Sequence, residues 1–165
     1  MKIAILSDTH NNVGNSQLAL KFIAGAGINT IIHCGDVIDP EILEYFGEYR
    51  IFLAYGNGDY PRELKERISW FRDDNISAAF LELTLDGKQI FITHGHDRSM
   101  LNNAIESGKF DYVFHGHTHR YRDENFGKTR VINPGALGGR KIEARSFVLL
   151  DLATGEGKRI FLDQG

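Results

Sequence analysis

Along the first seventy or so residues, continuous apolar runs of strand length alternate with segments in which apolar residues repeat at helical spacing. The apolar runs occupy residues 3–6, 30–32 and 51–55. Such short, unbroken runs favour strands that are buried on both faces. Helices are expected between them, at 18–26, after the cap Asp39-Pro40, and from Pro61 onward. This repetition of strand, loop and helix predicts βαβ units around a parallel sheet.

The second half of the chain has a different pattern. Asp86-Gly87 separates apolar runs at 81–85 and 89–93, which is a strong signal for a two-residue hairpin. A further helix with apolar residues between 100 and 105 leads to a strand at 112–114. The last predicted strands cover 129–132, 146–151 and 158–162. We therefore expect one α/β domain over residues 1–165, with a later sheet that is partly antiparallel.

Composition narrows the class of protein. A chain of 165 residues with 42% hydrophobic and 25% charged residues is ordinary for one globular domain. The net charge of −3 disfavours nucleic acid as a partner. The one cysteine, Cys34, excludes an internal disulfide and fits a reducing compartment, so we expect a cytoplasmic protein. The apolar run at 3–6 is too short for a signal peptide or a membrane span, so a membrane partner is not expected.

Polar residues that could perform chemistry gather where the apolar runs end. Five run ends carry them: Asp8-Thr9-His10, Gly35-Asp36, Gly56-Asn57, His94-Gly95-His96 and residues 115–119. Each motif alone is weak, because such residues are common in caps and turns. In α/β sheets, however, ligands bind beyond the carboxyl ends of the strands. The joint occurrence of the five motifs therefore predicts one site built from five loops.

The residue types in these loops indicate a site for two metal ions. The set holds two carboxylates, one amide and four imidazoles: Asp8, Asp36, Asn57, His10, His94, His117 and His119. Two nearby cations repel each other, so they need a shared carboxylate; if Asp36 is shared, each ion has four protein ligands. Nitrogen and oxygen ligands without thiolate suit divalent transition metals, with Mn²⁺ as first candidate and Ni²⁺, Fe, Co²⁺ or Zn²⁺ as others.

Six short stretches carry a family resemblance: SDTH at 7–10, HCGD at 33–36, YGNGD at 55–59, THGH at 93–96, GHTH at 116–119 and INPG at 132–135. In them the chain resembles the calcineurin-like metallophosphoesterase superfamily, and specifically its small single-domain, YfcE-like phosphodiesterases. The resemblance implies a four-layer αββα sandwich, in which helices flank two facing mixed sheets and the metals lie at the carboxyl ends of strands. It also implies that a small-molecule phosphodiester is hydrolysed by a hydroxide bound to two metals.

Carried over by position, the resemblance assigns each ligand to a metal. One metal would be held by Asp8, His10 and His119, and the other by Asn57, His94 and His117. Asp36 would bridge the two. The turn at 133–135 is implied to be structural, without a ligand.

One position departs from the family pattern. Many members have a histidine directly after the ligand asparagine, where it protonates the leaving group, whereas this chain has Gly58. A missing general acid costs about 10²- to 10⁴-fold in rate. His96 and Arg98 are candidate replacements, and the residues we expect in catalysis are Asp36, Asn57 and His96. On this interpretation Gly58→His should speed hydrolysis of a substrate with a poor leaving group.

Two other functions fit the same fold. One is a protein-binding scaffold like the retromer subunit that resembles this family, and the other is a phosphomonoesterase. His33, His115 and Cys34 are expected to pack beside the site without binding metal. An exposed apolar patch around Trp70-Phe71 or Phe80 is the candidate surface for a homodimer.

Overall fold

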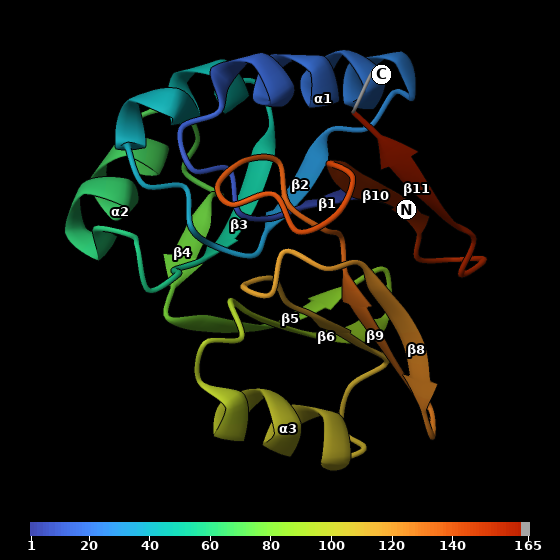
Figure 1. Cartoon of the computed structure of the whole chain (residues 1–165). Helices are drawn as coiled ribbons and strands as arrows, with labels where there is room; N and C mark the ends of the chain where they lie inside the picture. The colour runs from blue at the N-terminus through green and yellow to red at the C-terminus, as the bar shows by residue number, and fades with distance from the viewer. Residues whose placement is uncertain (163–165) are drawn as a thin grey trace.

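Two β-sheets lie face to face, and helices cover their outer faces, so that the layers run helix, sheet, sheet, helix (Figure 1). The computed structural model describes residues 1–162. This arrangement confirms the four-layer αββα sandwich of the sequence analysis.

The larger sheet has six strands in the order β11-β10-β1-β2-β3-β4. Four of them are parallel: β1 (Lys2–Leu6), β2 (Thr30–His33), β3 (Arg50–Ala54) and β4 (Ile76–Ala78). The antiparallel strands β10 (Ser146–Asp151) and β11 (Gly157–Phe161) complete it. His33 is in register with Leu6 on one side and Leu53 on the other. Three central strands therefore end at the same level, and the loops that follow them lie side by side.

The smaller sheet has five strands in the order β5-β6-β7-β9-β8. Its strands are β5 (Phe80–Leu85), β6 (Lys88–Thr93), β7 (Tyr112–Phe114), β8 (Arg122–Phe126) and β9 (Thr129–Asn133). The hairpin between β5 and β6 is confirmed, and positive φ at both Asp86 and Gly87 is the conformation that such a tight turn requires. β6 and β7 are parallel with Ile92 opposite Phe114, so their following loops also meet.

Within the described residues 1–162, four helices cover the sheets. α1 (Val13–Gly25), the 3₁₀ helix η1 (Pro40–Phe46) and α2 (Pro61–Ser69) pack on the larger sheet, and α3 (Arg98–Glu106) packs on the smaller one. Asn12 caps α1 by accepting the N–H of Asn15, which starts the helix before its apolar stripe begins. Within residues 1–162 no helix combines the length and apolar character needed to cross a membrane.

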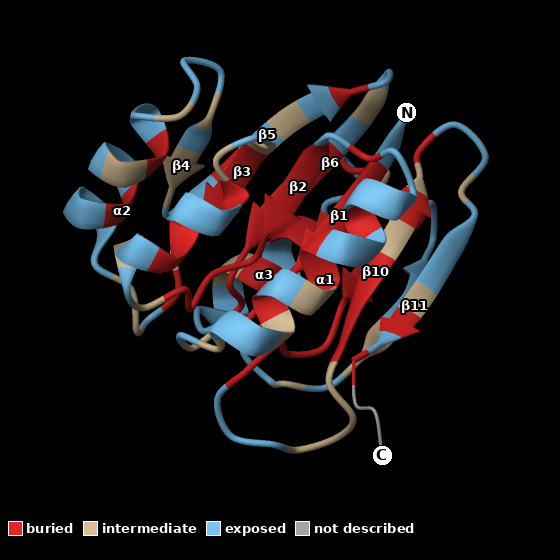
Figure 2. Ribbon diagram, turned by 90° about the horizontal axis from the view of Figure 1, so that it is seen from above, coloured by how far each residue is buried: buried red, intermediate tan, exposed pale blue. Residues whose placement is uncertain are grey.

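Alternation along the central strands divides the core into layers. Ile3 and Ile5 of β1 point between the sheets, where they join a cluster with Phe114 of the opposite sheet. Ala4 and Leu6 point outward and pack beneath the helices. Figure 2 shows β2 as buried throughout and β1 as buried after its exposed first residue, Lys2, with α1 lying over this part of the sheet. Burial on both faces explains why these strands read as unbroken apolar runs.

Two strands were not predicted from the sequence. β4 has three residues, of which Ile76 is exposed, and β8 reads Arg-Asp-Glu-Asn-Phe with four exposed side chains. Both are edge strands, and their pairing with β3 and β9 defines them. Neither strand buries a face, so neither leaves a hydrophobic pattern in the sequence.

Candidate metal centre

The loops after β1, β2, β6 and β7 converge at one edge of the two sheets. Hydrogen bonds tie them in pairs: the Asp8 N–H donates to the Gly35 carbonyl, and the Gly116 N–H donates to the His94 carbonyl, both at 2.9 Å. Gly35 has no side chain to hold the loops apart, since a Cβ there would lie 2.9 Å from His94 Nδ1. Side chains from both sheets therefore meet within one small volume.

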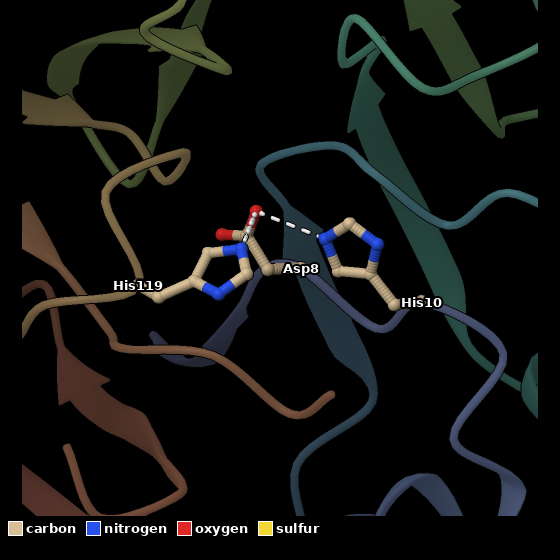
Figure 3. Close-up of side chains that lie close together, drawn as sticks. All are labelled: Asp8, His10 and His119. Atoms are coloured by element: carbon tan, nitrogen blue, oxygen red, sulfur yellow. Dashed lines mark ion pairs between the residues drawn. The ribbon is translucent and has the colours of Figure 1, made fainter. Parts of the chain in front are cut away.

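The first group of side chains is Asp8, His10 and His119 (Figure 3). The two imidazoles approach the same carboxylate oxygen, Asp8 Oδ1, with His119 Nε2 at 3.2 Å and His10 Nε2 at 3.7 Å. Within residues 1–162, Asp8 Oδ1 and His10 Nε2 are buried and have no hydrogen-bond partner. A buried polar atom without a partner is costly, and a cation between these atoms would satisfy both. The residues present therefore fit a metal ion.

The second group is Asp8, Asp36 and His94, and it shares Asp8 with the first. Asp36 Oδ2 lies 3.4 Å from His94 Nε2 and also 3.4 Å from His10 Nε2. His117 Nδ1 lies 3.3 Å from His94 Nε2, so this imidazole joins the group as well. The Asp36 carboxylate thus stands between a histidine of each group, where it can contact cations on both sides.

Backbone carbonyls set the tautomers of two of these histidines. His94 Nδ1 lies 2.7 Å from the carbonyl of Cys34, and His119 Nδ1 lies 2.7 Å from the carbonyl of Arg140. A carbonyl can only accept, so each Nδ1 carries a proton, and each Nε2 is left directed at the carboxylates as the nitrogen that could bind a cation. Metal-binding histidines are commonly oriented by such contacts.

The charges of the site favour ionised carboxylates. Burial acts to raise the pKa of Asp8, but the adjacent His10 and His119 imidazoles outweigh it, and the pKa is lowered. Burial likewise opposes ionisation of Asp36, yet His94 and the Gly58 N–H lower its pKa. Both carboxylates are therefore held in the form that metal binding requires.

The backbone of the site is in an uncommon conformation. Five of its residues have a positive φ: Asp8 (53°), His10 (42°), Asp36 (58°), His117 (69°) and His119 (56°). Each such residue other than glycine costs about 1–3 kcal/mol unless its surroundings hold it, and such residues concentrate at functional sites. The Asn133 amide contributes to this support, because its Nδ2 donates to the Gly116 carbonyl at 2.9 Å and to Thr118 Oγ1 at 3.0 Å.

Comparison with known proteins identifies this arrangement. The profile of the calcineurin-like phosphoesterase superfamily domain matches residues 1–155. The chain belongs to the calcineurin-like phosphoesterase superfamily. With the Asp/His groups described above, membership in this superfamily makes the protein a metal-dependent phosphoesterase that uses divalent ions.

Named members of the superfamily resemble this chain over most of its length. Phosphodiesterase MJ0936 of Methanocaldococcus jannaschii is 36% identical over 166 residues, covering 99% of this chain and all of that protein. Phosphodiesterase YfcE of Escherichia coli is 26% identical over 152 residues, covering 83% of this chain and 79% of the other. The solved structure of an archaeal phosphodiesterase has a TM-score of 0.93 at 36% identity and covers 98% of this chain and 100% of its own. The resemblance stated from the motifs is confirmed.

Two residues expected in catalysis lie at the rim of this phosphoesterase site. Asn57 is exposed in the loop after β3, next to Gly58, whose N–H donates to Asp36 Oδ1 at 2.9 Å. The exposed His96 ring lies 5.5 Å from the His94 ring and 6.3 Å from the His117 ring, measured between centroids. The loops that carry both residues therefore adjoin the two Asp/His groups.

The residues set aside from the sequence lie beside the metal-binding groups. His33 Nδ1 accepts the Gly35 N–H at 3.1 Å, so its Nε2–H donates to Thr9 Oγ1 at 2.7 Å and links the loops after β1 and β2. His115 is buried with Nδ1 against the Gly116 carbonyl. Cys34 is a buried free thiol.

Sequence reasoning gave Asp59 no role, because no histidine stands beside it. In the structure its carboxylate accepts hydrogen bonds from backbone N–H groups of two loops of the site. The only sequence signal was an acidic residue closing the turn Gly56-Asn57-Gly58.

Proposed function

We propose that this protein hydrolyses phosphodiester bonds in small molecules with the help of two bound divalent metal ions. The observation that carries the proposal is the place of Asp36, whose Oδ2 lies 3.4 Å from a histidine nitrogen on either side. The relatives named as phosphodiesterases, of which MJ0936 matches along 99% of this chain, support diesters as the substrate class.

The proposed ligands follow the two groups. Asp8, His10 and His119 would hold one ion, Asn57, His94 and His117 would hold the other, and Asp36 would contact both. Bound there, the two cations would lower the pKa of a water and stabilise the negative charge that develops on phosphorus. A ligand set of nitrogen and oxygen without thiolate fits Mn²⁺ first, with Ni²⁺, Fe, Co²⁺ and Zn²⁺ as alternatives.

The chain's own residues prepare this site before any substrate arrives. Fixed tautomers at His94 and His119 keep both Nε2 lone pairs available. His96, exposed at the rim, is the imidazole we propose to donate a proton to the leaving group, because Gly58 carries no side chain that could do so.

The scaffold alternative is weaker than the enzymatic one. A scaffold would have no need to keep Asp8 Oδ1 and His10 Nε2 buried without partners, whereas a metal enzyme would.

The one free thiol, Cys34, is the basis for our proposal of a reducing, cytoplasmic compartment.

The experiment compares hydrolysis of bis-p-nitrophenyl phosphate and p-nitrophenyl phosphate with Mn²⁺ or Ni²⁺, before and after chelation. We expect the diester to react faster, and the rate to be lost with a chelator and in Asp36→Ala and His94→Ala. Asp111→Asn is the matched control, because this carboxylate accepts the Gln89 N–H at the start of β7, away from the site. Faster hydrolysis of the monoester, or no hydrolysis with any metal, would contradict the proposal.

A further inference from the structure

Asp59 joins the loops after β2 and β3 through a single carboxylate. Its Oδ2 accepts the N–H of Gly56 at 2.7 Å and the N–H of Asp36 at 2.9 Å. Its Oδ1 accepts the N–H of Ile38 at 2.9 Å. The Gly56 contact is local, but the other two donors lie more than twenty residues earlier in the chain. Asp59 therefore does more than close its own turn.

The loop after β2, whose Asp36 and Ile38 N–H groups donate two of these hydrogen bonds, has a backbone that needs support. Asp36 has φ of 58° and Ile38 has φ of 77°. A positive φ is unusual for any residue with a side chain, and for a β-branched residue such as isoleucine it is a true outlier. Hydrogen bonds to an ionised acceptor are about twice as strong as neutral ones, so the two that this loop donates to the Asp59 carboxylate help to offset this cost.

The same loop places the carboxylate that stands between the two histidines. The Gly58 N–H adds a contact to Asp36 Oδ1 at 2.9 Å, which leaves Asp36 Oδ2 facing His10 and His94. Asp59 thus holds the main chain of Asp36, and the N–H of Gly58 holds the Asp36 side chain.

We propose that Asp59 is a positioning residue for the metal centre: it holds the loop after β2 in its left-handed conformation, and so keeps the Asp36 carboxylate between His10 and His94. This inference rests on the proposed function, because it concerns how the proposed metal site is kept in shape. Both Asp59 oxygens are engaged by backbone N–H groups, so its effect passes through Asp36.

The test compares Asp59→Asn with the control Asp111→Asn. Asparagine has the shape of aspartate, but its nitrogen cannot accept, so at least one of the three N–H groups loses its partner. We would measure Mn²⁺ binding by titration calorimetry, the electron paramagnetic resonance of the bound Mn²⁺ pair, and thermal unfolding with and without Mn²⁺. Asp59→Asn should weaken Mn²⁺ binding by about 10- to 100-fold and reduce the spin-coupled signal, as loss of contacts that orient a ligand commonly does. Asp111→Asn should bind as the wild type does.

A second variant separates positioning from loss of folding. Glycine adopts a positive φ without strain, so Ile38→Gly added to Asp59→Asn should recover roughly two- to fivefold of the lost affinity. The inference is overturned if Asp59→Asn binds Mn²⁺ like the wild type, if it only lowers the melting temperature equally with and without Mn²⁺, or if Ile38→Gly restores nothing. A wild type that binds no metal would overturn the proposed function as well, whereas a metal-binding wild type with an unaffected Asp59→Asn would overturn this inference alone.

Discussion

A histidine at position 58 would meet Ile38 before it could serve as a proton donor. A Cβ built on Gly58 lies 2.6 Å from Ile38 Cδ1 and 3.2 Å from Asp36 Oδ1. The gain expected from Gly58→His on the sequence alone therefore needs a second change. Ile38→Ala removes the end of the isoleucine side chain and opens the space.

The size of the effect follows from the distances. Carbon atoms in contact normally stand about 3.5–4.0 Å apart, so the new Cβ would be roughly 1 Å too close. Overpacking costs about 1–3 kcal/mol, and since the clashing atom is the end of a half-buried side chain that can partly move away, we expect Gly58→His to lose about 1–2 kcal/mol of unfolding free energy. Ile38 is half-buried, so Ile38→Ala should cost less than the ~2–5 kcal/mol of a fully buried site. The double variant should therefore lose about 1–2 kcal/mol less unfolding free energy than the sum of the losses in the two single variants.

The assay is urea unfolding of the wild type, both single variants and the double variant, together with hydrolysis of alkyl and nitrophenyl diesters. We expect Gly58→His to gain nothing on the alkyl diester. His96 is the proposed proton donor, so the double variant is also compared in a His96→Ala background, where its new histidine should restore up to the ~10²- to 10⁴-fold that a general acid supplies. Additive stabilities would refute the steric argument. A stable double variant that restores no rate on the alkyl diester in the His96→Ala background would instead refute a proton donor at position 58.

Three further predictions concern metal, pH and packing. Mn²⁺ at 100 times its dissociation constant should raise the unfolding free energy by about 2.7 kcal/mol, and chelation should reverse this in a thermal melt; an unchanged melt would argue against a preformed site. Burial lowers the pKa of His33 and His115 to about 4, from 6.5, so the unfolded chain binds more protons between those values. Stability should therefore fall as pH drops through this window, by on the order of 3 kcal/mol per group, and His115→Asn should flatten the slope in urea titrations. Gly116→Ala would bring a Cβ into a clash with Ser7 Oγ, so it should lower both the melting temperature and Mn²⁺ affinity; a variant that binds Mn²⁺ normally would show that this loop can shift freely.

The central strands could be predicted from the sequence because they are buried on both faces. β1, β2 and β3 leave unbroken apolar runs, and each ends abruptly in polar residues. The edge strands β4 and β8 leave no such pattern, since their neighbours define them through backbone pairing. Sequence reasoning therefore found the strands that carry the site and missed two at the margins.

For the site, the sequence indicated which residues meet but not how they are held. Five polar strand ends were enough to predict that Asp8, Asp36 and His94 would gather, and the structure brings these side chains together. The hydrogen bonds that Asp59 accepts from the loop after β2, and the place of Ile38 over Gly58, join residues about twenty positions apart. Such contacts depend on three-dimensional packing, so no local pattern in the sequence predicts them.

The Asp/His groups draw on both halves of the sandwich. Asp8 and Asp36 follow strands of the six-stranded sheet, whereas His94 and His117 follow strands of the five-stranded sheet. Metal ions bound by all four residues would cross-link the two sheets at one end. Sliding of one sheet over the other would then pull ligands away from the ions, so bound metal should oppose such sliding. Loading with Mn²⁺ should accordingly slow amide exchange in β1 and β7 by similar factors, although the two strands belong to different sheets.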